Sequence, residues 1–487
     1  MIMIAIFSAA GFAAAFMALV AVAALMHLTT YRRAGFAVYF AIPILAMMAV
    51  AMLASGRDLS IPPELVGEFV PLRPAVVVWT TRVASLMLLL AAVERIASYC
   101  IARNRTSPRD VSAAAPMFLI LSFLALWAGT VLSPSLMGAV PMVSHEYVYT
   151  ALIGAALLVA TANEAAIAVR TIRDATMVFM VAGIVAAVVQ PAIALETAYG
   201  QGLIPGLPRL AGLSSHAVGL GMIALLGLLA VWVRPYSSLI MTLLAWFLGL
   251  AVLFLCQSKT GWLTFAVCAA VMIVVRNKDE ALRWASRPRN VLGLVTMLAG
   301  IGAAIAITGS VVVLGDLANR LQAFLLTDEG AQLATMTGRD QIWEVALQEW
   351  ARHPAFGYGP GMFDETYRTV IGMPFATHGH NQLIDTLARS GTVGAVVMVW
   401  YWIVLSVYAI RHTNASGGLT AALLLLLTMR AVSEVPFDLF SYGTESLPHF
   451  LLLVCIAGHE RARSPARAVP TASRPPVRLP SHQVVQV

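Results

Sequence analysis

Two histidines that lie two residues apart, His378 and His380, are the side chains whose type and spacing could do chemistry. A histidine can accept a proton near neutral pH, and its ring nitrogens also bind metal ions. A zinc site needs three or four ligands, and no third ligand stands at a recognisable spacing from this pair, so no bound metal is expected. Taken alone, the pair fits surface residues of a loop best, and a catalytic role needs further support.

The residues before this pair predict a surface helix followed by a turn. Thr337 is a suitable N-cap, and the stretch from Gly338 places apolar residues on one face at helical spacing, namely Trp343, Ala346, Leu347 and Trp350. Pro354 ends this helix, and three glycines then predict a flexible turn, at positions 357, 359 and 361. We expect the helix to lie along a membrane surface or to pack on top of a helix bundle.

The composition indicates a membrane protein. Of the 487 residues, 60% are hydrophobic and 11% are charged, and the mean hydropathy is +0.82. Soluble domains contain about 45–50% apolar and about 25% charged residues, so a soluble enzyme and a disordered chain are excluded. Four cysteines are too few for a disulfide scaffold. The net charge of +7 comes from short basic clusters between apolar runs, which is not the pattern of a nucleic-acid surface.

Apolar runs long enough to span a membrane predict about 13 transmembrane helices, with 12 as the lower count. They fall near 2–28, 35–55, 74–99, 111–132, 147–169, 175–198, 215–233, 237–256, 260–276, 291–314, 389–411, 418–434 and 446–460. The first run has no basic residue before it, so we expect a span rather than a cleaved signal peptide. A short helix is expected from Gln382, and Gly391 and Gly394 mark the start of the eleventh span.

Basic residues set the expected orientation. Every odd-numbered loop carries Lys or Arg, for example Arg170 and Arg173 after the fifth span, and the even-numbered loops are poor in both. By the positive-inside rule the odd-numbered loops are cytoplasmic, and the N-terminus lies outside. The sequence then divides into a membrane bundle at 1–314, an outward loop at 315–388, C-terminal membrane helices at 389–460 and a disordered cytoplasmic tail at 461–487.

The outward loop resembles the O-antigen ligase and polysaccharide polymerase family of bacterial inner-membrane proteins. The family pattern is a Gly-Arg, a Trp, a Pro, a Gly-x-Gly turn, a His-x-His-Asn and a Gly-x-x-Gly. The matching residues are Gly338-Arg339, Trp343, Pro354, Gly357 and Gly359, His378-Gly379-His380-Asn381 and Gly391-Thr392-Val393-Gly394. Two weaker likenesses precede them, the segment from Arg209 to Leu213 and the segment Ser258-Lys259-Thr260-Gly261, where Lys replaces the usual Arg. Lysine binds phosphate as a point charge and lacks the planar fork of arginine.

The resemblance implies a fold and a reaction. The fold would be an all-α, GT-C-like bundle of membrane helices, and the reaction would transfer a glycan from undecaprenyl diphosphate at the periplasmic face of the inner membrane. The acceptor would be lipid A-core for a ligase, or the growing polysaccharide for a polymerase, and membrane lipids would surround the site. No cofactor is implied, because the diphosphate ester is already activated. The sequence also lacks a P-loop and a dinucleotide fingerprint.

The resemblance also implies residue roles. His380, which directly precedes Asn381, would be the general base, with His378 as the alternative. Arg339, Arg209 and Lys259 would stabilise the leaving diphosphate. Asn381, Trp343 and Arg430 would help to bind the substrates.

Charges within the apolar runs are further candidates for lining a glycan site, among them Arg82, Glu164, Glu196 and Glu434. For each of them a buried pair that fixes helix packing is the favoured interpretation. Arg430 and Glu434 stand four residues apart, so they could pair with each other. His216 is expected to be a polar residue at the outer face.

Two alternatives stay open at this stage. Motifs alone separate a ligase poorly from a polymerase, and the ligase is slightly favoured. A transporter or flippase would explain the spans and the buried charges but not the motifs of the outer loop, and it predicts that His380→Ala leaves function largely intact. The sugar, the linkage and the oligomeric state do not follow from the sequence.

Overall fold

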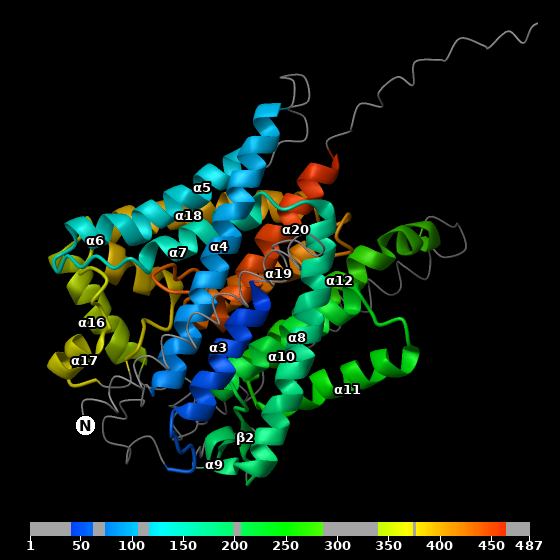
Figure 1. The fold of residues 1–487 in the computed structure, drawn as a ribbon, viewed down its shortest axis with the longest axis horizontal. Helices are drawn as coiled ribbons and strands as arrows, with labels where there is room; N and C mark the ends of the chain where they lie inside the picture. The colour runs from blue at the N-terminus through cyan, green and yellow to red at the C-terminus, as the bar shows by residue number, and fades with distance from the viewer. Residues whose placement is uncertain are drawn as a thin grey trace, which may run out of the picture.

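The fold is a bundle of α-helices (Figure 1). This computed structural model describes residues 40–61, 74–105, 116–197, 206–285, 339–373 and 376–463. The spans expected at 2–28 and 291–314, the first part of the outward loop up to residue 338 and the tail from residue 464 lie outside the described residues.

Five helical segments in the described part of the chain are long and apolar enough to cross a membrane. They are Ala75–Ile101 in α4 (Ala75–Arg105), Met117–Met137 across α5 (Met117–Trp127), η4 (Ala128–Leu132) and α6 (Ser133–Met137), α8 (Ala162–Val189), Lys259–Lys278 in α12 (Lys259–Ala285), and α18 (Gln382–Arg411). The predicted all-α, multi-pass membrane bundle is therefore confirmed.

Five further apolar helices are shorter than the roughly 20 residues expected of a span. They are α3 (Ala41–Ala54), α7 (Tyr147–Leu158), α10 (Ala217–Val233), α11 (Leu239–Leu255) and α19 (Leu419–Ser433). The shortest, α7, has 12 residues and so covers about 18 Å, less than the hydrocarbon core of a bilayer. The last described helix, α20 (Leu447–Arg463), is buried along most of its length and packs on α8 and α19.

The boundary predicted between the fifth and sixth spans is wrong. The chain breaks at residues 159–161, and α8 begins at Ala162, so Arg170 and Arg173 lie inside a helix rather than in a loop. The cause is a capping box at Thr161, whose hydroxyl accepts from the Glu164 amide while the Glu164 carboxylate accepts from the Thr161 amide at 2.7 Å. Glu164 also pairs with Arg95 at 2.9 Å, which is the packing role favoured for it.

Helix α10 is the central helix of the bundle and packs against α8, α11 and α12. Every residue from Gly219 to Val231 is buried. A helix that is apolar on all faces is stable only when other elements surround it. Because these neighbours hold α10 in place, they also fix the position of the residues at its N-terminus. His216 is the N-cap of α10, where its Nδ1 atom accepts a hydrogen bond from the Gly219 amide at 3.1 Å.

Helices α16 (Arg339–Arg352) and α17 (Glu365–Ile371) form a small layer at one end of the bundle, beside α6 (Figure 1). A hydrophobic cluster separate from the main core holds this layer together. It combines residues of the two helices with residues between and after them, namely Ile342, Ala346, Met362, Phe363, Tyr367, Ala376 and Ala388. The helix predicted from Gly338 to Pro354 is thus present, but its predicted apolar face is partly wrong. The buried positions are 342, 346 and 349, whereas Leu347 is 40% exposed. Glu349 is buried because its carboxylate accepts from Arg352 at 2.6 Å.

The glycine-rich turn after α16 is a tightly packed junction rather than a flexible loop. The Tyr358 amide donates to the Ala388 carbonyl at 2.8 Å, and the Gly359 amide donates to the Arg389 carbonyl at 3.0 Å. On the other side, the Val140 amide donates to the Tyr358 carbonyl at 2.8 Å. Gly357 has a φ of +70°, and a Cβ there would lie 2.5 Å from the Arg389 carbonyl carbon. This junction ties the α16–α17 layer to α18.

We expect Gly357→Ala to lower the free energy of unfolding by about 2–4 kcal/mol, because it combines backbone strain with an overpacked contact. Thermal unfolding of the detergent-purified protein measures the loss. Gly372→Ala is the matched control, since Gly372 has a φ of +68° but nothing within 4 Å of its Cβ position. That control should cost only the strain, about 1–2 kcal/mol. Equal losses for the two variants would mean that the junction is not tightly packed.

Helix α18 contains both the short helix and the span that the sequence predicts as separate elements. A non-helical residue divides it, Gly391, with φ 64° and ψ −165°. The Ala355 backbone approaches within 2.4 Å of the Cβ position of Gly391, so only glycine fits there. The predicted entry to the span at this glycine therefore corresponds to a kink against the turn that follows α16.

Candidate functional site

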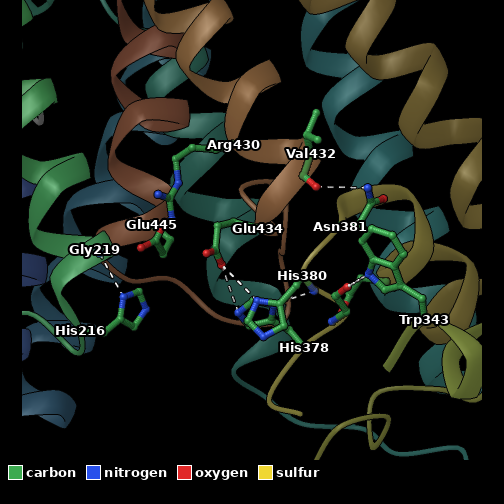
Figure 2. Close-up of polar contacts among 12 residues, drawn as sticks. His216, Gly219, Trp343, His378, His380, Asn381, Arg430, Val432, Glu434 and Glu445 are labelled. Carbon is green, nitrogen blue, oxygen red and sulfur yellow. Dashed lines mark hydrogen bonds and ion pairs between the residues drawn. The ribbon is translucent and has the colours of Figure 1, made fainter. Parts of the chain in front are cut away.

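The two histidines of the motif lie against the C-terminal end of α19 (Figure 2). His378 Nε2 is 3.3 Å from Glu434 Oε2, and His380 Nδ1 is 3.9 Å from the same oxygen. The two imidazole rings are tilted, with centroids 4.0 Å apart. The histidine pair therefore shares one carboxylate, although Glu434 stands 54 positions after His380 in the sequence.

Four hydrogen bonds, to residues of α16, α18 and α19, hold the loop that carries the histidines. The Trp343 indole donates to the Gly379 carbonyl at 2.8 Å, and the Gly379 amide donates to Asp385 Oδ1 at 2.8 Å. Asn381 caps α18 by accepting from the Leu383 amide at 3.0 Å, and its side-chain amide donates to the Val432 carbonyl at 3.3 Å. Trp343 and Asn381, which were expected to bind substrate, thus position the histidines through these bonds (Figure 2).

The backbone of His380 is unusual. Its φ is 45°, in the left-handed region that a residue with a Cβ seldom adopts. Such strain costs on the order of 1–3 kcal/mol and is found preferentially at functional sites. The surrounding bonds of Gly379 and Asn381 supply the restraint that keeps His380 in this conformation.

Hydrogen bonding distinguishes the two histidines. His378 Nδ1 accepts from the His380 amide at 3.1 Å, so in the neutral ring the proton resides on Nε2, which faces Glu434. His380 Nδ1 is buried and has no hydrogen-bond partner within the described part of the chain, and Glu434 Oε2 lies 3.9 Å from it. A proton on His380 Nδ1 would face Glu434 and leave Nε2 as the basic nitrogen.

Burial keeps both imidazoles uncharged at neutral pH. Desolvation lowers the pKa of His378 to about 3, and the positive charges of Arg389, His216, Arg339 and Arg430 act in the same direction. Desolvation also lowers the pKa of His380 to about 3, followed by the effects of His378, Arg339 and His216. The same burial raises the pKa of Glu434. The contacts of Glu434 with the histidines are therefore not salt bridges, and each ring keeps a lone pair that can accept a proton.

Two arginines predicted from the sequence lie within electrostatic reach of the histidines. Arg339 is the first residue of α16, and its charge acts on both histidines and on Glu434. Arg430 acts on His378 and Glu434, but its guanidinium pairs with Glu445 at 2.5 Å. The predicted pair of Arg430 with Glu434 is wrong. Glu434 is the C-cap of α19 with an extended backbone, φ −149° and ψ −172°, so helical spacing does not apply to it.

The other two predicted cations lie further from the histidines. Arg209, in β2 (Arg209–Leu210), pairs at 3.0 Å with Glu196 in β1 (Leu195–Glu196), and Glu196 accepts from the Ala217 amide at the start of α10. Arg209 is therefore connected to the site through the segment that carries His216. Lys259 is exposed at the start of α12, and none of the contacts in the described residues joins it to the histidine loop.

A narrow depression, with room for about one water molecule, lies between α10, α12 and α19. It is lined by Met222, Leu225, Thr260, Gly261, Thr264, Met429 and Arg430. The depression also brings the Ser258–Gly261 segment, which follows α11, close to Arg430.

Sequence reasoning missed two residues of this site. Glu434 was set aside as a possible partner of Arg430, and the signal that could have found it is the Pro436 two residues later, which ends the helical register. His216 was expected to be a polar surface residue, yet its charge lowers the pKa of both motif histidines (Figure 2). Only the tertiary arrangement shows that His216 faces this site.

The comparisons with known proteins agree with the geometry. Residues 241–399 match the model of the O-antigen ligase family, and no curated protein matches the chain. The matched segment is about a third of the chain and contains Lys259, Arg339, the His-Gly-His-Asn motif and the kink at Gly391, whereas Arg209, His216, Arg430 and Glu434 lie outside it. The expected resemblance to the O-antigen ligase family is therefore confirmed over residues 241–399.

Proposed function

We propose that this protein transfers a glycan from undecaprenyl diphosphate to an acceptor at the periplasmic face of the bacterial inner membrane, as an O-antigen ligase. The match of residues 241–399 to the O-antigen ligase family supports glycosyl transfer of the ligase or polymerase type in polysaccharide assembly. The donor, the acceptor and the side of the membrane are parts of the proposal. The observation that carries it is the arrangement of His380 against the buried carboxylate of Glu434.

His380 is the proposed general base. The acceptor hydroxyl attacks the anomeric carbon, the bond from that carbon to the diphosphate oxygen breaks, and the hydroxyl proton passes to His380 Nε2. Glu434 then stabilises the imidazolium through the Nδ1 proton, so the base gains its positive charge next to a negative one. Burial keeps the imidazole neutral at pH 7, so its lone pair is not taken by a proton, and the nearby carboxylate of Glu434 offsets the desolvation that opposes protonation.

The leaving lipid diphosphate develops negative charge as the bond breaks. Arg339 and Arg430 are the proposed cations that stabilise it, with Arg209 and Lys259 acting further from the histidines. Fixed guanidinium groups can carry out this role without a metal ion, and we propose a metal-independent, GT-C-like transferase.

A glycan profile of a deletion strain tests this proposal. The strain is complemented with wild type or with His380→Ala, and the lipid-linked, lipid A-linked and secreted pools are separated by gel and mass spectrometry. For His380→Ala we expect full-length polymer on the lipid carrier and bare lipid A-core. Single repeat units without long polymer would instead establish a polymerase. Full rescue by His380→Ala would refute the catalytic assignment and favour a transporter.

A further inference from the structure

We propose that His378, His380 and Glu434 form a binding site for a divalent transition metal of the zinc type, and that the bound ion inhibits transfer by occupying the base. The existence of the site rests on the geometry alone. Its inhibitory effect rests on the proposed function, and the two parts are tested separately.

The three side chains already lie near the spacing that a zinc ion requires. One nitrogen from each histidine and one carboxylate oxygen all lie within 4.8 Å of one another. Two of these separations, both to Glu434 Oε2, are 3.3 and 3.9 Å. Zinc binds nitrogen and oxygen at about 2.0–2.2 Å in tetrahedral geometry, which places neighbouring ligand atoms about 3.4 Å apart. Small side-chain rotations would therefore complete the site.

The chemistry of the donors selects the class of metal. Two imidazoles with one carboxylate suit zinc and similar borderline ions, whereas magnesium and calcium prefer oxygen ligands alone. Among the described residues, nothing forms a hydrogen bond with the buried Nδ1 of His380, and a metal ion would satisfy this nitrogen.

Two features limit the affinity and place the ion at the reacting atoms. Coordination through His378 Nε2 moves the ring proton to Nδ1 and breaks the bond from the His380 amide. The site also offers three protein ligands, so a fourth position stays open to water, as in catalytic zinc sites. An ion bound to His380 Nδ1 would separate Glu434 from the ring and place the ring proton on Nε2, and the acceptor hydroxyl would then lose its base.

Zinc titration of the metal-stripped, full-length protein in detergent tests the site without any need for activity. A chelating dye reports free Zn²⁺, and we expect one ion per chain. Glu434→Gln and His378→Ala should each weaken binding on the order of 100-fold, whereas His353→Ala should bind as wild type does, because His353 is exposed near the end of α16. Co²⁺ should give the visible absorption bands of a tetrahedral site, which Glu434→Gln should abolish.

Two results would overturn the proposed site, and a third would overturn only its inhibitory role. Zinc binding that is unchanged in Glu434→Gln, with wild-type thermal unfolding, would exclude the three-ligand site. Equal binding of Mg²⁺ would exclude the ligand class. If zinc binds as expected but transfer by the wild type is unaffected, the inhibitory role is wrong while the site stands. Inhibition that a chelator reverses, and that Mg²⁺ does not reproduce, would support both parts.

Discussion

We expect His380→Ala to lower the rate of glycan transfer by about 10²–10⁴-fold, the range that a positioned general base contributes. The physical reason is that His380 joins a neutral, partly exposed imidazole to the buried carboxylate of Glu434, whereas both ring nitrogens of His378 already have neighbours. A purified protein in detergent, supplied with lipid-linked donor and acceptor, measures this rate. The KM for the donor should change little, because the base acts on the acceptor hydroxyl.

His378→Ala separates the roles of the two histidines. Both nitrogens of His378 have neighbours in the structure, the His380 amide at Nδ1 and Glu434 at Nε2, so His378 orients the loop and the carboxylate. We therefore expect a smaller loss, about 10-fold, which corresponds to one hydrogen bond. His353→Ala is the matched control and should keep the wild-type rate. A larger loss in His378→Ala than in His380→Ala would reverse the assignment of the base.

The local part of the site could be predicted from the sequence, because it is encoded in neighbouring residues. The sequence predicts a short helix from Gln382, and α18 does begin there, with Asn381 as its N-cap. Pro354 marks the end of α16, and Gly391 marks the kink in α18. Each of these features depends on backbone chemistry within one turn of the residue concerned.

The non-local part could not be predicted. Glu434 and His216 reach the histidines from helix ends that come together only when α10 and α19 pack in the bundle. Nothing in the spacing of an apolar run tells which of its flanking charges turns inward. The helix boundary at Thr161 was missed for a similar reason. A threonine among apolar residues is compatible with a continuous span, and only the structure shows that Thr161 caps a new helix.

We expect Glu434→Gln to lower the transfer rate by about 10–100-fold without displacing the histidine loop. Glutamine has the shape of glutamate but lacks its charge, so the imidazolium that forms at His380 loses the attraction of a carboxylate 3.9 Å away, worth about 1–4 kcal/mol. The loss should fall on kcat rather than on KM, because this interaction strengthens only as the proton arrives. Glu460→Gln is the matched control. Glu460 lies 2.7 Å from His412 Nε2 in a histidine–glutamate pair formed by other elements, and its loss should leave transfer unchanged.

A double-mutant cycle decides whether Glu434 acts through His380. If Glu434 serves the base, Glu434→Gln should have little further effect in the His380→Ala background, because the imidazolium that it stabilises no longer forms. The single losses would then be strongly non-additive, with a coupling close to the whole effect of Glu434→Gln. Additive losses would show that Glu434 acts independently of the histidine, for example on a bound sugar. In that case Glu434 would not be the partner of the base. Another group would have to stabilise the imidazolium that forms when His380 takes the proton of the acceptor.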